Sequence, residues 1–481
     1  MTHDEPYLHP SYASLNYVLL FPHGEDGWHI NIPSQPGIMV RQEVPKLAKE
    51  AIMHTTLFWG GELLQQYTVD VWSSIEQSNL NWVRHHQKKL RTNICQGLKN
   101  AAVGNRDENM NLEQNGKHII LPLSHAGSKR QMNQLFQDSM AICWAFKKPD
   151  IFLTMTANAA WDEINEALLR ETPPGTRKQT AADRPDIVVR VFEEKKKAVL
   201  KEIKEGLFGK VAAMVHTIEF QKRGLPHMHL LIFLGPDYKI RDANDVDSIV
   251  SAQIPDPETE PVLYDIITKS MVHGRCLPGM DPPPKCWADG KCSKQYPKEF
   301  PEVTIFGEDG YPLYARPNNG RTFRKGNHTY DNRDVVPHNA YLAAKYKCHI
   351  NVEICTSIDS VKYIHKYIYK GYDHTTMEIA GDQERDEIRE YLDAQFIGSA
   401  ESCWHIFEFS MHAEFPTVYR LPVHLPDQQL IYFNADDHLN EVLERASDKT
   451  ALTAWFEANR TYSESCTTLY QDFPYGHVYA K

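Results

Sequence analysis

Apolar and polar residues recur with two different periods along this chain, and the period distinguishes helical from extended segments. Residues 61–99 carry apolar side chains at helical spacing, among them Leu64, Val71 and Ile75. That spacing predicts one long helix. Nearer the N-terminus, residues 17–24 form an apolar run that ends in Pro-His-Gly. We expect that run to be extended and to stop at a turn.

A second group of patterns predicts a sheet with helices packed against it. Residues 150–156 and 211–221 are rich in β-branched and apolar residues, and residues 227–234 repeat the pattern after a Lys-Arg-Gly-Leu-Pro turn. The last two segments therefore predict an antiparallel hairpin. Further helices are predicted over 186–205, 357–370 and 383–394. Strands mixed with helices and at least one hairpin indicate an α+β fold.

Composition shifts divide the chain into three regions. The first, 1–145, is dominated by the predicted long helix, and the second, 146–400, contains the predicted sheet. The second is interrupted by a Pro- and Cys-rich insert at about 254–330. The third region is 401–481. At roughly 100–200 residues per domain, 481 residues suit this number of regions.

Composition excludes several classes of protein. Hydrophobic residues make up 42% and charged residues 24% of the chain, as in ordinary globular proteins. No apolar run reaches the roughly 20 residues that cross a bilayer, and the polar, acidic first ten residues do not resemble a secretory signal. The nine cysteines are scattered and odd in number, which favours a reducing compartment. Cys95, Cys143 and Cys403 are predicted to be buried thiols.

The net charge of −11 argues against simple coating of DNA, although three basic runs occur locally. They are residues 84–91, 195–197 and 321–325. Each run either contacts phosphate or is a solvated face of the protein.

A His-x-His pair is the first candidate for chemistry. His227 and His229 are two apart on a predicted strand and therefore point to the same face. With a five-residue turn at 222–226, Gln221 lies opposite His227 and Glu219 opposite His229. Two imidazoles and one oxygen suit Mn²⁺ or Mg²⁺, and also Zn²⁺. The alternative is a pair of hydrogen-bonded histidines in a half-buried strand.

The second candidate is a pair of tyrosines. Tyr363 and Tyr367 are four apart and share one face of the predicted helix. A phenol with a pKa of about 10 needs a cation or a polarised phosphate to act as a nucleophile. Lys366 and Lys370, one turn apart, are candidate phosphate contacts. The alternative is that the tyrosines pack in a core.

A third candidate lies in the insert. His273, Cys276, Cys286 and Cys292 place four soft ligands within twenty residues, a composition that suits structural Zn²⁺. Their spacing differs from paired Cys-x2-Cys knuckles, and Cys348-His349 is a further source of ligands. The alternative is ordinary thiols in a Pro-rich loop.

These motifs together resemble the N-terminal region of Helitron transposases, which contains an HUH (Rep-type) nuclease domain. The resemblance covers roughly residues 17–433 in the family's order, and no phosphate-binding loop of a helicase is present. The segments that carry it are residues 21–28, 152–164, 219–229, 360–371 and 420–426.

The resemblance implies a central antiparallel sheet flanked by helices, with metal on the sheet and tyrosines on a neighbouring helix. It implies metal-dependent nicking and strand transfer of single-stranded DNA at transposon ends and targets, through a 5′-phosphotyrosine intermediate. His227 and His229 would bind Mg²⁺ or Mn²⁺ with Glu219, or alternatively Gln221, as third ligand. Tyr363 and Tyr367 would be the nucleophiles.

For partners and location, the resemblance implies a helicase domain in a longer chain and the nucleus of a eukaryotic host. Arg223, in the turn beside the histidines, joins Lys366 and Lys370 as a candidate DNA contact. Trp82, Trp161 and Tyr67 either stack on bases or belong to the core.

Three other functions are consistent with parts of the pattern. One is a DNA-binding module without catalysis, and another is a replication initiator of a plasmid or virus that uses the same chemistry. The third is a zinc metallohydrolase that uses His227 and His229, which forms no tyrosine adduct.

Overall fold

The computed structural model separates into two units, each described here by itself. The first comprises residues 1–75, 135–370 and 397–416, and the second residues 76–134, 371–396 and 417–481. The structure describes residues 12–21, 56–87, 92–94, 121–171, 175, 177–220, 224–276, 284, 286–307, 311–355, 388, 391, 397–425, 430–432, 450–462 and 466–473.

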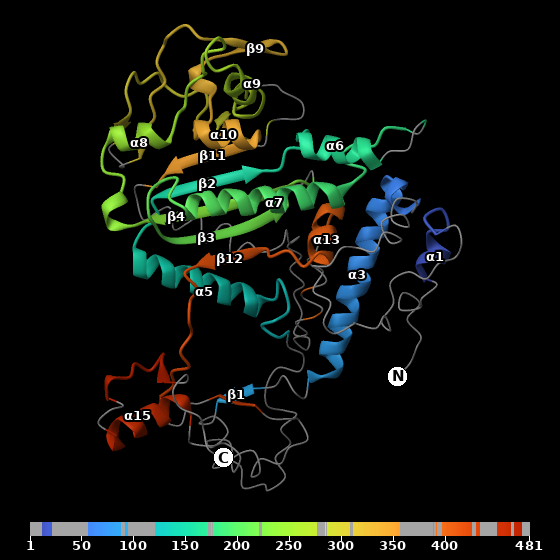
Figure 1. The fold of residues 1–481 in the computed structure, drawn as a ribbon, viewed down its shortest axis with the longest axis vertical. Coiled ribbons are helices and arrows are strands. Elements are labelled where there is room, and N and C mark those ends of the chain that lie inside the picture. Colours follow the sequence, from blue (N-terminus) through green and yellow to red (C-terminus); the bar gives the residue numbers. More distant parts are fainter. Residues whose placement is uncertain are drawn as a thin grey trace. The chain divides into compact units, whose positions relative to one another are not determined.

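A five-stranded sheet forms the centre of the first unit (Figure 1). Its strand order is β11-β2-β4-β3-β12, and every neighbouring pair is antiparallel. This confirms the predicted α+β class, and β2, β3 and β4 match the three predicted strands. The strands are β2 (Ile151–Thr156), β3 (Val211–Phe220), β4 (Pro226–Leu234), β11 (His349–Ile354) and β12 (His412–Phe415).

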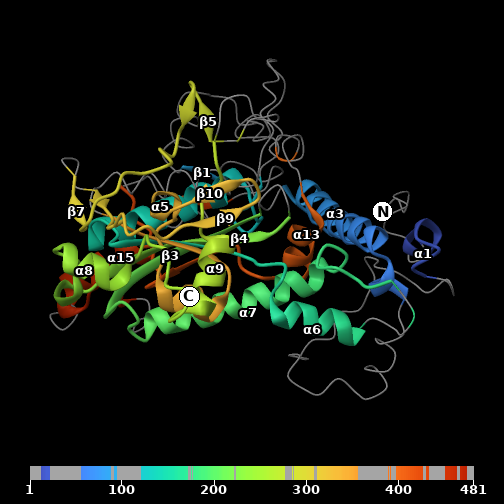
Figure 2. The same ribbon diagram turned by 90° about the horizontal axis from the view of Figure 1, so that it is seen from above.

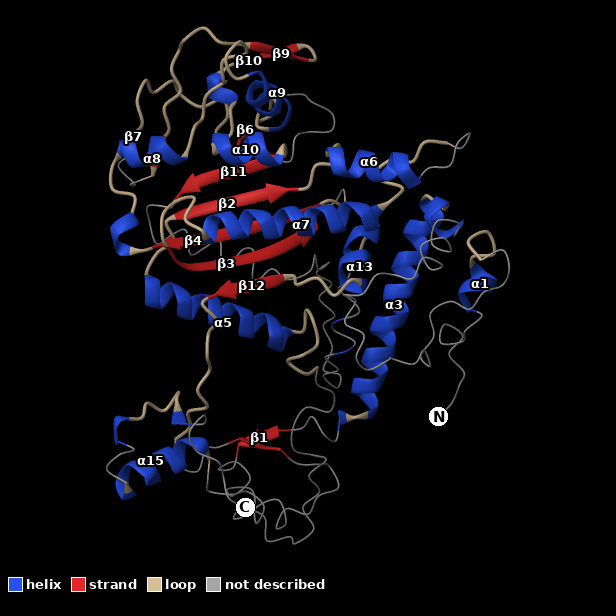
Figure 3. Cartoon of the chain, in the orientation of Figure 1, coloured by secondary structure: helices blue, strands red, loops and turns tan. Residues whose placement is uncertain are grey.

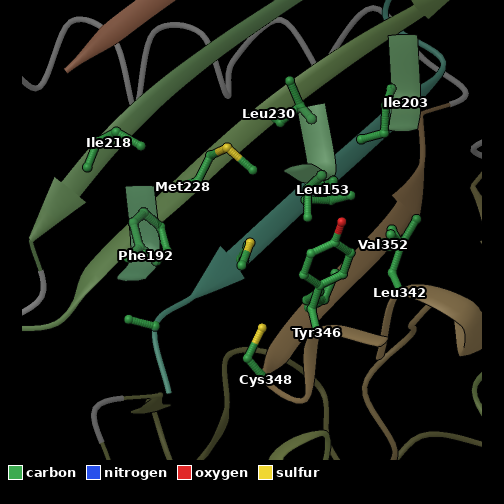
Figure 4. Close-up of a cluster of buried hydrophobic side chains, with 14 of the residues drawn as sticks. Leu153, Phe192, Ile203, Ile218, Met228, Leu230, Leu342, Tyr346, Cys348 and Val352 are labelled. Carbon is green, nitrogen blue, oxygen red and sulfur yellow. The ribbon is translucent and has the colours of Figure 1, made fainter. Parts of the chain in front are cut away.

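One face of the sheet packs against helix α7 (Pro185–Lys204), which matches the helix predicted at 186–205. Phe192 and Ile203 on α7 are fully buried, as are Leu153 and Leu230 on the strands. Figure 4 shows these side chains directed into one cluster. Alternate residues of each strand supply this cluster, so the residues between them face the other side of the sheet.

Two more helices complete this side of the sheet. Helix α6 (Asp162–Glu171) and helix α13 (Ser399–Ile406) contact α7, and Trp404 of α13 is fully buried in the same cluster. Strand β12, which follows α13, adds the fifth strand beside β3. The sheet unit thus continues past residue 400, where the composition of the sequence changes.

The insert between β4 and β11 has a small core of its own, which includes Leu263, Ile267 and Val335. Two antiparallel bridges, Ser251 to His338 and Val272 to Val335, join its two ends. Short hairpins project from it (Figure 2). Its elements are η5 (Pro236–Tyr238), α8 (Ala243–Ile249), α9 (Pro261–Ser270), β5 (Trp287–Ala288), β6 (Lys291–Cys292), β7 (Ile305–Phe306), β8 (Pro312–Leu313), β9 (Phe323–Lys325), β10 (His328–Tyr330), η6 (Asn332–Asp334) and α10 (Ala340–Tyr346).

The N-terminal region differs from its prediction in two places (Figure 3). Helix α3 covers Glu62–His85 rather than 61–99, and a short strand β1 (Thr92–Ile94) lies within the predicted helix. Residues 17–21 do not form an extended segment, because after α1 (Tyr12–Asn16) the chain turns, with the amides of Leu20 and Phe21 bonded to the Tyr17 carbonyl. In the first stretch, helical periodicity was outweighed by the pairing of β1 with β13. In the second, the extended conformation expected of the apolar run was replaced by the turn that these hydrogen bonds close.

The remaining elements are η2 (Thr56–Trp59), α5 (Lys129–Phe146), β13 (Leu430–Tyr432) and α15 (Ala451–Thr461). In the second unit β1 pairs with β13, and Leu80, Val83, Leu121, Ile388 and Tyr391 form a small core. The helices predicted over 357–370 and 383–394 lie outside the described residues, apart from Ile388 and Tyr391.

Candidate metal centre on the sheet

The two histidines lie on β4, on the sheet face opposite α7. The register of the hairpin differs from the prediction by one side-chain pair. Phe220 pairs with Pro226, so Glu219 lies opposite His227 and Thr217 opposite His229. The five-residue loop therefore covers 221–225 rather than 222–226. This register brings Glu219 to the histidines, whereas Gln221 lies outside the described residues.

Contacts on this face orient both imidazoles. Nδ1 of His227 forms a hydrogen bond with Oγ1 of Thr156, at 2.5 Å, on the neighbouring strand β2. Nε2 of His229 lies 3.2 Å from Oε2 of Glu219. The ring of His229 stacks on Phe152 at 5.9 Å, and the two histidine rings are 4.5 Å apart. A metal-binding imidazole is normally held by a bond to its other nitrogen, as His227 is held by Thr156.

Burial keeps His227 in the form that a metal requires. Desolvation, with smaller contributions from His229 and His349, lowers the pKa of His227 to about 3. The ring is therefore neutral near pH 7. In the tautomer whose Nδ1–H donates to Thr156, Nε2 carries the lone pair. Neutral imidazole nitrogen is the ligand form for divalent metals.

The chemistry of these three side chains fits a divalent ion. Adjacent ligands of an octahedral Mg²⁺ ion are about 3 Å apart, given metal–oxygen distances near 2.1 Å, and the contact between Glu219 and His229 is 3.2 Å. Nitrogen with carboxylate ligands also suits Mn²⁺. The ligand atoms of His227, His229 and Glu219 do not all lie within 4.8 Å of one another, unlike those of the insert cluster described below.

The histidines open onto a cavity of about 1230 Å³. One wall is the sheet, with Thr154, Asn351 and Glu353 beside the histidines, and the other wall is the insert, from Val272 to Arg316. At the far end of the same sheet face, Phe146 of α5 contacts Phe233. The cavity can therefore admit a ligand to the histidine pair while helices and insert close the rest of the face.

The insert contains the four predicted zinc ligands, of which His273 lines the cavity, and the structure brings the four together. The ligand atoms of His273, Cys276, Cys286 and Cys292 all lie within 4.8 Å of one another. Among the described residues, no other set of three or more His, Cys, Asp or Glu side chains is grouped as closely. The cluster can hold a metal ion. His349, considered above as a further source of ligands, instead lies on β11 beside Thr156.

Several cations of the predicted basic runs have acidic partners where the structure describes them, although Arg324 is exposed. Lys195 pairs with Glu163 and Lys196 with Glu193, while Arg321 pairs with Asp256. In the run 84–91, residues 88–91 lie outside the described residues. The candidate contacts Arg223, Lys366 and Lys370 and the tyrosines Tyr363 and Tyr367 also lie outside them.

Among the aromatic candidates, Trp161 is 2% exposed and donates its indole N–H to the Tyr346 carbonyl, so it belongs to the core. Tyr67 packs against Tyr17 and Phe21. Trp82 is 55% exposed and stacks on His86. The buried state predicted for Cys143 and Cys403 is confirmed.

Sequence reasoning missed several residues of the cavity, chiefly Lys294, Lys298 and Asn351. The segment Cys292-Ser-Lys-Gln-Tyr-Pro-Lys298 mixes basic and aromatic residues directly after a predicted metal ligand. That mixture is typical of nucleic-acid-binding loops and was the available signal.

A comparison with known protein families found a match for part of the chain. Residues 46–232 match the family model described as the Helitron helicase-like domain at the N-terminus. The match includes β2, β3 and both histidines, and ends within β4. It confirms the resemblance to the N-terminal region of Helitron transposases. A search of curated proteins found no match. In the described part of the chain, no helix is long and apolar enough to cross a membrane.

Proposed function

We propose that this chain, which carries the N-terminal region of a Helitron transposase, is an HUH endonuclease that nicks and transfers single-stranded DNA. The observation that carries the proposal is the convergence of His227, His229 and Glu219 on one sheet face that opens onto a cavity. The match of residues 46–232 to the Helitron N-terminal family model supports a role for that face in DNA transposition.

Each side chain has a defined part in the reaction. His227, oriented by Thr156, and His229, beside Glu219, hold Mg²⁺ or Mn²⁺. When bound, the ion polarises the scissile phosphate and stabilises the charge that develops on it. The phenol of Tyr363 or Tyr367 releases its proton to solvent as its oxygen attacks phosphorus. A phosphorus–tyrosine oxygen bond forms, and the bond to the 3′ oxygen breaks. The leaving oxygen takes up a proton and becomes a free 3′-hydroxyl.

The covalent 5′-phosphotyrosine keeps the energy of the phosphodiester bond. A 3′-hydroxyl of a second strand can attack it and rejoin DNA without ATP. Two tyrosines allow one to hold a donor end while the other acts on a second strand. The resemblance to Helitron transposases implies transposon-end and target DNA as partners, and the nucleus of a eukaryotic host as the site of action.

A structural Zn²⁺ ion in the insert is the second part of the proposal. Tetrahedral Zn²⁺, with about 2.3 Å to sulfur and 2.0–2.1 Å to nitrogen, sets sulfur–nitrogen edges near 3.5 Å. The distances from Nε2 of His273 to the sulfurs of Cys276, Cys286 and Cys292 are 3.3, 3.5 and 3.5 Å. The Cys276 and Cys286 sulfurs are 3.0 Å apart, well beyond the 2.05 Å of a disulfide.

The test is a covalent-adduct assay. The protein is incubated with labelled single-stranded oligonucleotides and Mn²⁺ or Mg²⁺, and denaturing gels are used to detect a protein–DNA adduct. We expect an adduct that requires metal and is absent from the Tyr363→Phe, Tyr367→Phe double variant. Tyr369→Phe, two residues away on the same segment, is the matched control and retains the adduct.

Two outcomes contradict the proposal. An adduct that persists in the double variant refutes the assignment of the nucleophiles. Metal-dependent cleavage with no adduct in any variant points to a metallohydrolase that uses the same histidines.

A further inference from the structure

Two lysines of the insert face the histidine pair across the cavity. Lys294 and Lys298 line the same cavity as His227 and His229. The charge of Lys294 is close enough to contribute to the lowered pKa of His227, His273 and His349. A lysine on the insert therefore lies within electrostatic reach of the sheet.

Among the described residues, no carboxylate forms an ion pair with either ammonium. Lys294 is exposed, and no hydrogen bond or ion pair joins its side chain to another described residue. Lys298 is half-buried, and its ammonium lies 5.2 Å from the centre of the Tyr296 ring. By contrast, the third cation of this wall, Arg316, is engaged with the backbone carbonyls of Asn332 and Val335.

The metal-ligand cluster holds the backbone segment that carries the two lysines. Cys286 and Cys292 flank the hairpin β5–β6, whose Asp289 and Gly290 have positive φ angles of 52° and 76°, as a two-residue type I′ turn requires. The Cys292 sulfur accepts hydrogen bonds from the backbone amides of Lys294 and Tyr296. The chain leaving the last ligand is thereby fixed to that ligand.

An aromatic contact extends the same support to Lys298. The His273 ring stacks on the Tyr296 ring, with 4.3 Å between the ring centres. The Lys298 ammonium lies over that same Tyr296 ring. The backbone amide of Lys298 also bonds to the Arg333 carbonyl. Ligand, tyrosine and lysine thus form one continuous support along the cavity wall.

We propose that Lys294 and Lys298 bind two backbone phosphates of the single strand that lies in this cavity, and that the His/Cys cluster holds them in position. The inference rests on the proposed function, because it assigns the strand to the histidine site. Phosphate is the matching ligand, since an unpaired ammonium is a point donor to phosphate oxygens. Glu299 and Glu353 also line the cavity, so its surface is not uniformly basic. The affinity for the strand therefore depends on individual lysine–phosphate contacts.

The test measures equilibrium binding of a labelled single-stranded oligonucleotide by fluorescence anisotropy at several salt concentrations. All variants are made in the Tyr363→Phe, Tyr367→Phe protein and measured without divalent ions. The oligonucleotide is then not cleaved, and only binding is measured. Each phosphate contact to a single strand contributes about 0.7 to the slope of log K against log salt. Loss of both lysines should reduce that slope by about 1.4 and weaken binding about 25-fold at 0.1 M salt.

Lys291→Ala is the matched control. Lys291 is exposed on the same hairpin but is not among the residues that line the cavity. We expect it to bind like the parent, and the Lys294→Arg, Lys298→Arg variant to keep most of its affinity. An unchanged slope in the double alanine variant, or an equal loss in Lys291→Ala, overturns the inference.

The result is independent of the nicking test. If the adduct assay fails while the lysine-dependent slope remains, the cavity binds DNA without the proposed chemistry. If adducts form while the slope is unchanged, the chemistry stands and the assignment of the lysines is wrong.

Discussion

The hydrogen bond between Thr156 and His227 offers a sharp test of the sheet site. Thr156→Val replaces a hydroxyl by a methyl of nearly the same size and removes the bond between Oγ1 and Nδ1 of His227, which is 2.5 Å long. The imidazole would then lose the contact that selects its tautomer and fixes its ring. Loss of such a contact next to a metal ligand typically lowers metal affinity 10- to 100-fold. That range corresponds to about 1.4–2.7 kcal/mol.

The neighbouring threonine supplies the control. Thr154 lies on the same strand and face, opposite His229, and lines the same cavity. No hydrogen bond joins its hydroxyl to another residue in the described part of the chain. Thr154→Val therefore makes the same chemical change without removing support from a histidine, and we expect its Mn²⁺ affinity to remain close to that of the parent.

The assay is titration of the metal-free protein with Mn²⁺, followed by electron paramagnetic resonance of the unbound ion, with thermal unfolding as a check on folding. Weaker binding in Thr156→Val alone supports the reasoning. Equal losses in both variants would mean that the affinity depends on the polarity of the cavity rather than on the orientation of His227. Unchanged affinity in Thr156→Val would remove His227 from the metal site.

Three further predictions follow from other contacts. Glu219→Ala should weaken Mn²⁺ binding in the same titration, because it removes the carboxylate 3.2 Å from His229, and an unaltered titration would leave Gln221 as the third ligand. Cys286→Ser should lower bound zinc, measured by atomic emission, whereas Cys466→Ser, at an exposed thiol outside the cluster, should not, and equal zinc in both variants would refute the insert site. Burial lowers the pKa of His338 to about 4. Between about pH 6.5 and pH 4 the ring therefore binds a proton in the unfolded chain but not in the folded chain. Folding stability that is present above pH 6.5 is lost as the pH falls towards 4. The loss between pH 7 and 5 is about 2 kcal/mol for this ring, and His338→Gln should flatten that part of the stability profile measured by urea unfolding.

The sequence alone predicted the local parts of the sheet unit. Strand β2, helix α7 and the β3–β4 hairpin follow from apolar periodicity and turn residues, because both are encoded within a few neighbouring positions. The shared face of His227 and His229 follows from the two-residue period of a strand. The grouping of the four His and Cys side chains was also predicted from their closeness in sequence, and it is confirmed.

Tertiary structure decided what lies across from those local parts. Whether Glu219 or Gln221 faces His227 depends on which residues close the hairpin, and a shift of one pair changes the neighbour of every side chain. Pairing of β11 with β2, and of β12 with β3, joins segments nearly two hundred residues apart, so no local pattern reveals it. Packing of the insert on the sheet also places Lys294 and Lys298 in the same cavity as the histidines. The sequence alone does not show which of its many lysines lie there.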